Sequence, residues 1–354
     1  MNIYIQGTGC VSAQETSKGG AFPEDILPWE GPRLKASEPD YKQWIDVKLI
    51  RRMSRVIKMG VAAAQLGLQE AGVQKPDAII TGTAYGCLDD TGVFLSKMIN
   101  QQEEMLTPTA FIQSTHNTVA GQIALMLGCH GYNNTFVHKG FSFESALLDA
   151  VMILREGQSS TILAGAMDEL TNHSFNILSR FDLYKKEPVT PDTLLNSHTH
   201  GTVAGEGATC FVLGTEKGAN TKVKLAGVTT LYKPGGKAEI SADIAAFLAA
   251  HQCSEEEVSL VITGRNGDAS GDEWYEYVET QLLPGKPVAC FKHLCGEYPT
   301  AAAFGMWMGA KIIAAQQAPA AALFKGHLPG EVRKILIYNH YKQTHHSLIL
   351  LTAC

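Results

Sequence analysis

Two segments of this chain each occur a second time, and both copies keep the same spacing. The apolar run 77–82 is echoed at 259–264, and the run 118–128, rich in Ala, Gly and Met, is echoed at 300–309. The Gly that ends the first run and the Thr that begins the second are 36 positions apart in both copies (118 − 82 and 300 − 264). A short apolar run ending in Thr-Gly is typical of a buried strand, and an Ala-rich run is typical of a tightly packed helix. The pattern therefore predicts a duplicated α/β unit, with a functional site where the two copies meet.

The composition is that of an ordinary globular protein and argues against several classes of function. The chain has 354 residues, of which 45% are hydrophobic and 18% charged, and its net charge is −6. This charge argues against a nucleic-acid partner, which favours a basic face. The first residues lack the basic and apolar regions of a signal peptide, and no apolar stretch reaches the ~20 residues that span a bilayer. We expect a cytoplasmic protein without a membrane partner.

The spacing of cysteine, histidine and glycine predicts neither a metal nor a cofactor. None of the eight cysteines forms a Cys-x-x-Cys pair, and several lie in apolar runs that are typical of small buried side chains. The pairs His198/His200 and His345/His346 have no evident third ligand in the sequence. The glycine-rich segment 201–207 precedes a predicted strand and not a helix, so it does not fit a nucleotide-binding loop.

The order of the predicted elements divides the chain into two halves, 1–215 and 221–354, with a polar linker at 214–220 and a proline-containing cap insertion at about 15–50. Predicted helices cover 51–71, 118–127, 142–154, 240–251, 272–282, 300–309 and 311–316. Predicted strands cover 3–6, 78–81, 135–137, 161–165, 208–213, 223–226, 260–263, 287–291, 335–338 and 347–351. The segment 172–200 is expected to be irregular. Alternating strands and helices in both halves predict an α/β protein whose sheets are covered by helices.

Four motifs, in their order along the chain, resemble the β-ketoacyl-acyl-carrier-protein synthases of the thiolase fold. They are Arg51-Arg52-Met53-Ser54 at a helix start, the Asn-x-x-Ala-Gly pattern that begins at Asn117, the glycine-rich turn 201–208, and the lysine loop that begins at Lys292. The resemblance covers nearly the whole chain. It implies a thiolase-like fold in which two duplicated α/β halves form a layered α-β-α-β-α core.

The condensing reaction of this family requires a cysteine in a strand-to-helix turn, where the helix N-terminus lowers the pKa of the thiol. An ungapped match of the flanking segments places Gly140 at that position. The nearest hydroxyl belongs to Ser142, two residues further on. The resemblance therefore implies that the acyl-enzyme route is lost, because the turn carries no thiol.

Two histidines and a glycine loop of the family are also replaced. The histidines transfer protons and stabilise the enolate oxygen during decarboxylative condensation. The match places Asn266 in the turn of the first histidine and Glu297 at the position of the second. The glycine loop, whose backbone N–H groups reach the thioester oxygen in the family, follows Asn339 here and contains no glycine.

A protein that keeps this fold without the nucleophile resembles the chain-length factors, which pair with an active ketosynthase in biosynthesis of the fatty acid or polyketide type. The resemblance implies an acyl carrier protein and a ketosynthase as partners, in a heterodimer or otherwise a homodimer, as in aryl polyene and flexirubin-type pathways. Candidate residues for the substrate tunnel are Phe111, Gln113, His116, Asn117, His138, Phe141, Lys292 and Asn339. For the first four of these, plain core packing is the other interpretation.

Two further functions are open at this point. An acyltransferase or hydrolase of the same fold would use Ser142 or another nucleophile, with His138, Glu144, Glu297 or the turn 266–272 beside Ser142. The position of Ser142 also predicts a helix N-cap, with Glu144 favourable in the first turn. The third function is a scaffold or binding protein with no acyl substrate. A cavity beside Gly140 would favour an acyl-related role, and filled space there would favour the scaffold.

Overall fold

The two halves of the chain build their strands in the same spatial order. The computed structural model describes residues 1–20 and 22–354. The strands are β1 (Ile3–Val11), β2 (Ala78–Gly82), β3 (Asn133–Phe136), β4 (Thr161–Asp168), β5 (Gly207–Gly214), β6 (Val223–Tyr232), β7 (Leu260–Thr263), β8 (Val288–Cys290), β9 (Leu323–Lys325), β10 (Lys334–Tyr341) and β11 (His345–Ala353). Their order is β3-β2-β4-β5-β1 in the first half and β8-β7-β10-β11-β6 in the second. When the extra edge strand β9 is left out, both halves have the order third, second, fourth, fifth, first, which confirms the duplication.

The pairing directions are duplicated as well. In the first half β2 is parallel to β3 and β4, whereas β5 is antiparallel to β4 and β1. In the second half β7 is parallel to β8 and β10, whereas β11 is antiparallel to β10 and β6. An antiparallel pairing of β1 with β6 joins the two halves into one sheet of 11 strands, and β9 extends its edge beside β8.

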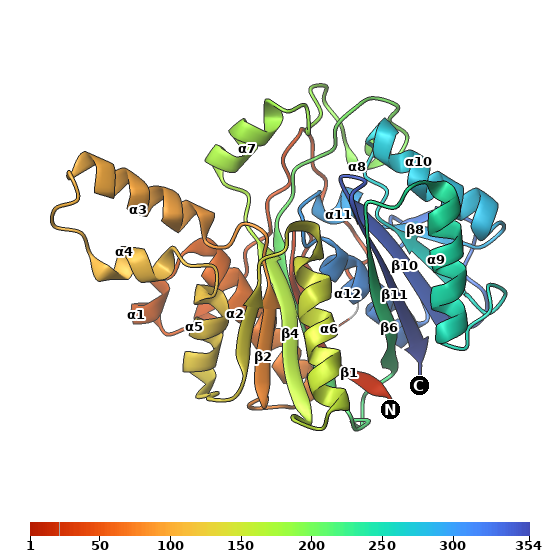
Figure 1. The fold of residues 1–354 in the computed structure, drawn as a ribbon, viewed down its shortest axis with the longest axis horizontal. Coiled ribbons are helices and arrows are strands. Elements are labelled where there is room, and N and C mark those ends of the chain that lie inside the picture. The colour runs from red at the N-terminus through yellow and green to blue at the C-terminus, as the bar shows by residue number, and fades with distance from the viewer. Residues whose placement is uncertain (21) are drawn as a thin grey trace.

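Helices cover both halves and also fill the space between them (Figure 1). The helices are α1 (Val47–Ile50), α2 (Arg55–Ala71), α3 (Leu88–Asn100), α4 (Pro108–Gln113), α5 (Thr118–Leu127), α6 (Ser142–Arg155), α7 (Asn172–Ser179), α8 (Pro191–Leu194), α9 (Lys237–Ala250), α10 (Ala269–Tyr277), α11 (Lys292–Cys295) and α12 (Ala302–Ala315). The outer faces of the two halves are covered by α2 with α5 and by α9 with α10, and the inner layer contains α6 and α12. This is the α-β-α-β-α arrangement that the resemblance implies.

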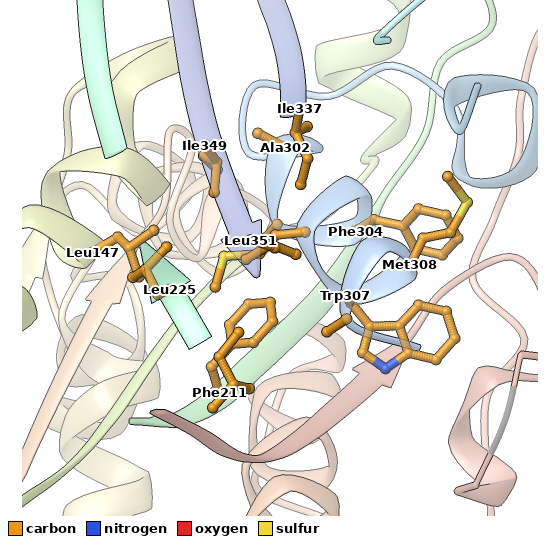
Figure 2. Packing of buried hydrophobic residues seen from close by; sticks show 14 of the residues in the cluster. Leu147, Phe211, Leu225, Ala302, Phe304, Trp307, Met308, Ile337, Ile349 and Leu351 are labelled. Atoms are coloured by element: carbon orange, nitrogen blue, oxygen red, sulfur yellow. The ribbon is translucent and has the colours of Figure 1, made fainter. Parts of the chain in front are cut away.

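Side chains that alternate along each strand explain these layers, since successive side chains of a strand point to opposite faces. In β11, Ile349 and Leu351 pack in the inner layer, and Leu348 and Leu350 pack against the outer helices of the second half. Both faces are apolar because both are buried. Figure 2 shows the inner layer, where the rings of Trp307 and its neighbours on α12 meet side chains from strands of both halves.

Several predicted helices differ from those in the structure. The predicted helix 51–71 begins at Arg55, after the separate turn α1, and the predicted helices 300–309 and 311–316 form the single helix α12. The segment 172–200 is not wholly irregular, because it contains α7 and α8. The echo between 118–128 and 300–309 is not a topological one: α5 precedes the third strand of its half, whereas α12 follows the third strand of the other half. Composition there reflects tight packing and not position in the fold.

The helices α3 and α4 lie beyond the edge of the sheet, at the left of Figure 1. They contact each other, and neither contains a buried residue. They are therefore an arm that the rest of this chain leaves uncovered. Among the described residues, no helix is long and apolar enough to cross a membrane.

Candidate functional site

The turn between β3 and α6 is the strand-to-helix turn to which the sequence assigns the missing nucleophile. After β3 ends at Phe136, a short 3-10 turn at Lys139–Phe141 leads directly into α6. Lys139 adopts a left-handed backbone conformation, with φ at 51°. A non-glycine residue in this region is strained, and such strain is typical of sharp strand-to-helix turns.

Ser142 closes this turn and does not cap the helix. Its buried hydroxyl accepts a hydrogen bond from the backbone N–H of His138 at 2.8 Å and donates one to the carbonyl of Lys139 at 2.8 Å. The N-cap residue of α6 is Phe141, so the predicted N-cap at Ser142 is wrong. The His138 side chain contacts Ser145 at 3.3 Å, and neither it nor Glu297 forms a hydrogen bond with the Ser142 hydroxyl within the described part of the chain. No activated serine is assembled here.

The space beside Gly140 is filled by two side chains from the opposite half. A Cβ atom added to Gly140 would lie 2.6 Å from the Cβ of Tyr341 and 3.0 Å from the Cβ of His345. Real Cβ atoms do not approach other atoms this closely, so a side chain at Gly140 would force one of these strands to move. Because Gly140 has no left-handed φ, space and not backbone geometry is what excludes a larger residue.

The hairpin between β10 and β11 supplies both of these side chains, and it lies where the resemblance places the glycine loop of the family. The backbone N–H of Thr344 donates to the carbonyl of Tyr341 at 3.2 Å, and the two central residues, Lys342 and Gln343, have φ of 53° and 55°. Two positive φ values at the central positions define a type I′ turn. The hydroxyl of Tyr341 also lies 3.2 Å from that of Tyr85, which ties the hairpin to the loop after β2. The structure therefore holds the hairpin against the strand-to-helix turn around Gly140, between β3 and α6, which we call the elbow.

Three of the sequence-predicted residues come together in the second half. The carboxylate oxygen Oε2 of Glu297 accepts from Lys292 Nζ at 2.6 Å and from Asn266 Nδ2 at 2.6 Å. Lys292 is buried and also donates to the carbonyl of His340 at 3.1 Å. A buried lysine and a buried carboxylate stabilise each other only as a pair. Glu297 thus accepts hydrogen bonds from both neighbours, and as a carboxylate it has no proton to donate to an oxyanion.

The turn that contains Asn266 is fixed by Asp272. Both carboxylate oxygens of Asp272 accept backbone N–H groups, from Asn266 at 3.0 Å and from Gly267 at 3.0 Å. Burial raises the pKa of Asp272 to about 6, and the nearby Arg265 opposes this rise. The remaining predicted residue of this region, Asn339, is buried on β10 and lies 3.4 Å from the Tyr275 hydroxyl.

A cavity opens on the other side of Tyr341 and encloses about 660 Å³, part of it open to solvent. Asn266 and Glu297 line it, but Gly140 and Ser142 do not. Its wall consists of Tyr85, Glu169, Leu170, Ser174, Leu178, Leu183, Tyr184, Thr202, Gly205, Asn266, Asp268, Gly271, Glu297, Tyr298, Pro299, His340, Tyr341, Lys342 and Gln343. The cavity therefore reaches Asn266 and Glu297, where the resemblance places the two histidines of the family, and Tyr341 of the hairpin lies between it and Gly140.

The other candidates for a tunnel are not part of the cavity wall, although Lys292 donates hydrogen bonds to Glu297 and to the carbonyl of His340, which are. Phe111, Gln113, His116 and Asn117 do not line it, and neither do His138, Phe141, Lys292 and Asn339. Core packing does not explain the first four, because Phe111 is 58% exposed and none of the four is buried. Phe141 is buried against the ring of His345, with 4.6 Å between the ring centroids.

Sequence reasoning missed Tyr85, Glu169 and His340, which all line the cavity. Tyr85 and Glu169 come shortly after β2 and β4, which are parallel neighbours. Residues that follow the carboxyl ends of neighbouring parallel strands gather at one edge of a sheet, so this signal was present in the sequence. Both ring nitrogens of His340 have hydrogen-bond partners in the protein backbone. Nε2 lies 2.9 Å from the carbonyl of Gly271, and Nδ1 lies 3.4 Å from the backbone N–H of Gln343. Burial holds the pKa of His340 well below its usual value.

The comparisons with known proteins agree with this fold. The family model for the N-terminal domain of β-ketoacyl synthases matches residues 36–219, just over half of the chain. The chain therefore belongs to the β-ketoacyl synthase family, within the class of duplicated thiolase-like proteins that its topology defines. A comparison with curated protein sequences gives no match.

Three solved structures are similar over the full length of the chain. The ishigamide ketosynthase/chain length factor has a TM-score of 0.77 and 16% identity, over 100% of this chain and 99% of that chain. A β-ketoacyl synthase from Burkholderia phymatum has a TM-score of 0.79 and 15% identity, over 100% and 99%. The ketosynthase ApeO in complex with its chain length factor ApeC from Xenorhabdus doucetiae has a TM-score of 0.78 and 17% identity, over 100% and 98%. At such low identity, the similarity establishes the fold alone.

Proposed function

We propose that this chain is a non-condensing subunit, similar to a chain-length factor, that pairs with an active ketosynthase. The observation that carries the proposal is the filled elbow. Where the family needs a cysteine side chain, Gly140 leaves no room for a Cβ atom beside Tyr341 and His345. Without a covalent nucleophile the acyl-enzyme route has no first step.

The remainder of the site supports the same conclusion. Glu297 is neutralised by Lys292, Asn266 is an amide, and both ring nitrogens of His340 face groups of the protein itself. The positions that the resemblance assigns to the two histidines therefore carry no imidazole to stabilise an enolate oxygen. Glu169, Asp268 and Glu297 also place carboxyl groups around the cavity, which disfavours the carboxylate of a malonyl thioester there.

The exposed arm formed by α3 and α4 supports the proposal that a partner subunit binds this chain. Its exposed apolar side chains include Ile99 at 74%, Met105 at 91%, Phe111 at 58% and Ile112 at 61%. Beside it, β3 is an edge strand whose outer side has no pairing partner among the described residues. A contiguous apolar surface next to a free strand edge is typical of a subunit interface. Two of the similar structures have titles that name a ketosynthase with a chain length factor, which supports a ketosynthase as the partner.

A scaffold role without an acyl substrate is the second candidate, and the filled space beside Gly140 favours it. The Ser142 alternative is weaker, because its hydroxyl is buried and donates to the Lys139 carbonyl. Acylation of Ser142 would require that bond to break and the turn to open. Mass spectrometry of the Ser142 peptide after incubation with acyl-loaded carrier protein tests this alternative, and an acylated peptide would support it.

The deciding experiment incubates the purified chain with malonyl- and acyl-loaded carrier protein, alone and with the ketosynthase encoded beside it. We expect no condensation by the chain alone, a stable complex with the ketosynthase on size exclusion, and products whose length differs from those of the ketosynthase alone. A complex without any change in product would favour the scaffold. Condensation by this chain alone would refute the proposal.

A matched pair of surface variants tests the interface. Phe111→Asp places a charge on the arm and is expected to abolish the complex. Ile177→Asp on α7 is the control, because Ile177 is 56% exposed and lies outside the arm. Equal loss of the complex in both variants would argue against the arm as the interface.

A further inference from the structure

The cavity holds one buried carboxyl group whose second oxygen has no protein partner. Glu169 follows β4 directly and is only 5% exposed. Its Oε1 accepts the backbone N–H of Asp89, at the start of α3, at 3.1 Å. For Oε2, residues 1–20 and 22–354 provide neither a hydrogen bond nor an ion pair, although this oxygen is not cut off from solvent. A buried carboxylate normally has partners for both oxygens, so this free oxygen on the cavity wall needs an explanation.

The other carboxylates of the wall are already bonded within the protein. Glu297 accepts from Lys292 and from Asn266. Asp268 accepts the backbone N–H of Gly201 at 3.2 Å and the hydroxyl of Ser270 at 3.2 Å. Glu297 also has an oxygen without a partner, Oε1, but its charge is paired with Lys292. Among the described residues, Glu169 is thus the wall carboxyl group that has a free acceptor and no cation beside it. The basic side chain of the wall is that of Lys342, and no ion pair joins it to Glu169 in the described part of the chain.

The remaining wall combines aromatic rings with apolar side chains. Tyr85, Tyr184 and Tyr341 contribute three rings, and Leu178 and Leu183 are among the aliphatic residues. Aromatic faces attract cations, and a carboxylate forms a strong charge-assisted hydrogen bond with an ammonium group. Apolar walls favour a ligand whose body is apolar. An anionic ligand would instead be repelled by Glu169.

We propose that this cavity binds a small primary amine with a short apolar body, whose ammonium group donates to Glu169 Oε2. The proposed contact, at Glu169, involves neither the turn at Gly140 nor Asn266 and Glu297, although these last two share the cavity wall. It does not depend on pairing with a ketosynthase, because every residue involved belongs to this chain. Failure to form a complex therefore leaves it standing.

The acidity of Glu169 provides a further readout. Burial is the main cause that raises the pKa of Glu169 to about 7, and the charges of Asp89, Asp90 and Glu206 add to it. An ammonium group needs the deprotonated carboxylate. Binding is therefore expected to strengthen as the pH rises from 6 to 8, a range in which an alkylammonium ion itself stays protonated.

The test titrates the full-length chain with n-butylammonium chloride at pH 8 in a calorimeter, with sodium butyrate and 1-butanol as matched ligands of different charge. We expect saturable binding of the amine alone. Glu169→Gln retains an acceptor for the Asp89 N–H but removes the charge, and it is expected to weaken binding by about tenfold or more. Unchanged folding of this variant is checked by its melting temperature without ligand.

A second pair of variants keeps Glu169 intact. Leu178→Trp fills the cavity and is expected to abolish binding, whereas Ile177→Trp, its neighbour on the exposed side of α7, leaves binding unchanged. The proposal is overturned if n-butylammonium does not bind saturably, if butyrate binds equally well, or if Glu169→Gln or Leu178→Trp binds the amine as the unmodified chain does.

Discussion

Replacing Gly140 by alanine tests whether the elbow is full. The added Cβ atom would lie 2.6 Å from the Cβ of Tyr341 and 3.0 Å from that of His345, both below ordinary contact distance. Overpacking of a buried site costs about 1–3 kcal/mol. Because the φ of Gly140 is not left-handed, alanine also gains about 0.4–1 kcal/mol from a less flexible unfolded chain. The net expectation is a loss of about 1–2 kcal/mol in the free energy of unfolding, measured by urea denaturation.

The position of the clash gives this prediction a sharp control. The nearest atom is the Cβ of Tyr341, which alanine at that position retains and glycine removes. In double-mutant cycles, Tyr341→Gly should offset the cost of Gly140→Ala, whereas Tyr341→Ala should offset much less of it. A free energy for Gly140→Ala within about 0.5 kcal/mol of the unmodified chain, or equal rescue by both variants, would refute the reasoning.

Three further predictions concern the same region. The combined change Lys342→Asn and Gln343→Gly places residues that favour left-handed backbone conformations at the two central positions of the turn. It should raise the free energy of unfolding, measured by urea denaturation, by about 0.5–1 kcal/mol. A lower free energy of unfolding would contradict the assignment of a type I′ turn. Burial raises the pKa of Glu144 to about 7, so its contribution to the free energy of unfolding is fully present below the unfolded pKa near 4.5 and is lost as the pH rises through 7. Glu144→Gln should therefore remove roughly 3 kcal/mol from the pH dependence of the free energy of unfolding. Parallel pH profiles of the variant and the unmodified chain would contradict this prediction. Glu297→Ala leaves Lys292 buried without its counter-charge and should cost about 3–5 kcal/mol in the same assay, of which Lys292→Met in the same chain recovers part; no recovery would show that the cost has another origin.

The sequence was sufficient to predict ten of the eleven strands that the structure describes, all except β9, and the duplicated architecture. The Thr-Gly runs at 77–82 and 259–264 become β2 and β7, which hold the same position in the two halves. An apolar run ending at a turn fixes the strand locally, whatever surrounds it. The prediction that the two Ala-rich runs are equivalent helices was wrong, because α5 and α12 share close packing but occupy different positions in the topology.

Residues that the sequence singled out lie close together where one loop carries them. Lys292 and Glu297 are five positions apart in that loop and form a hydrogen bond, and Asn266 joins them across the sheet. The contact between Gly140 and Tyr341 spans 201 positions (341 − 140), and no local pattern marks it. In the sequence, the bulky hairpin and the absent thiol are two separate departures from the pattern of the family. In space they are adjacent, because Tyr341 occupies the volume that a side chain at position 140 would need.

This coupling predicts what is required to place a reactive thiol at the elbow. Gly140→Cys alone should yield a thiol that iodoacetamide alkylates far more slowly than the exposed Cys354, because Tyr341 and His345 cover it. Combined with Tyr341→Gly, the introduced thiol gains room at the N-terminus of α6, where the helix dipole favours the thiolate, and its alkylation should accelerate by about tenfold or more. Peptide mass spectrometry of both variants, with Cys354 as the internal reference, measures the two rates. Rapid alkylation of the single variant would mean that the hairpin does not seal the elbow, and the inertness proposed for this subunit would then need another cause.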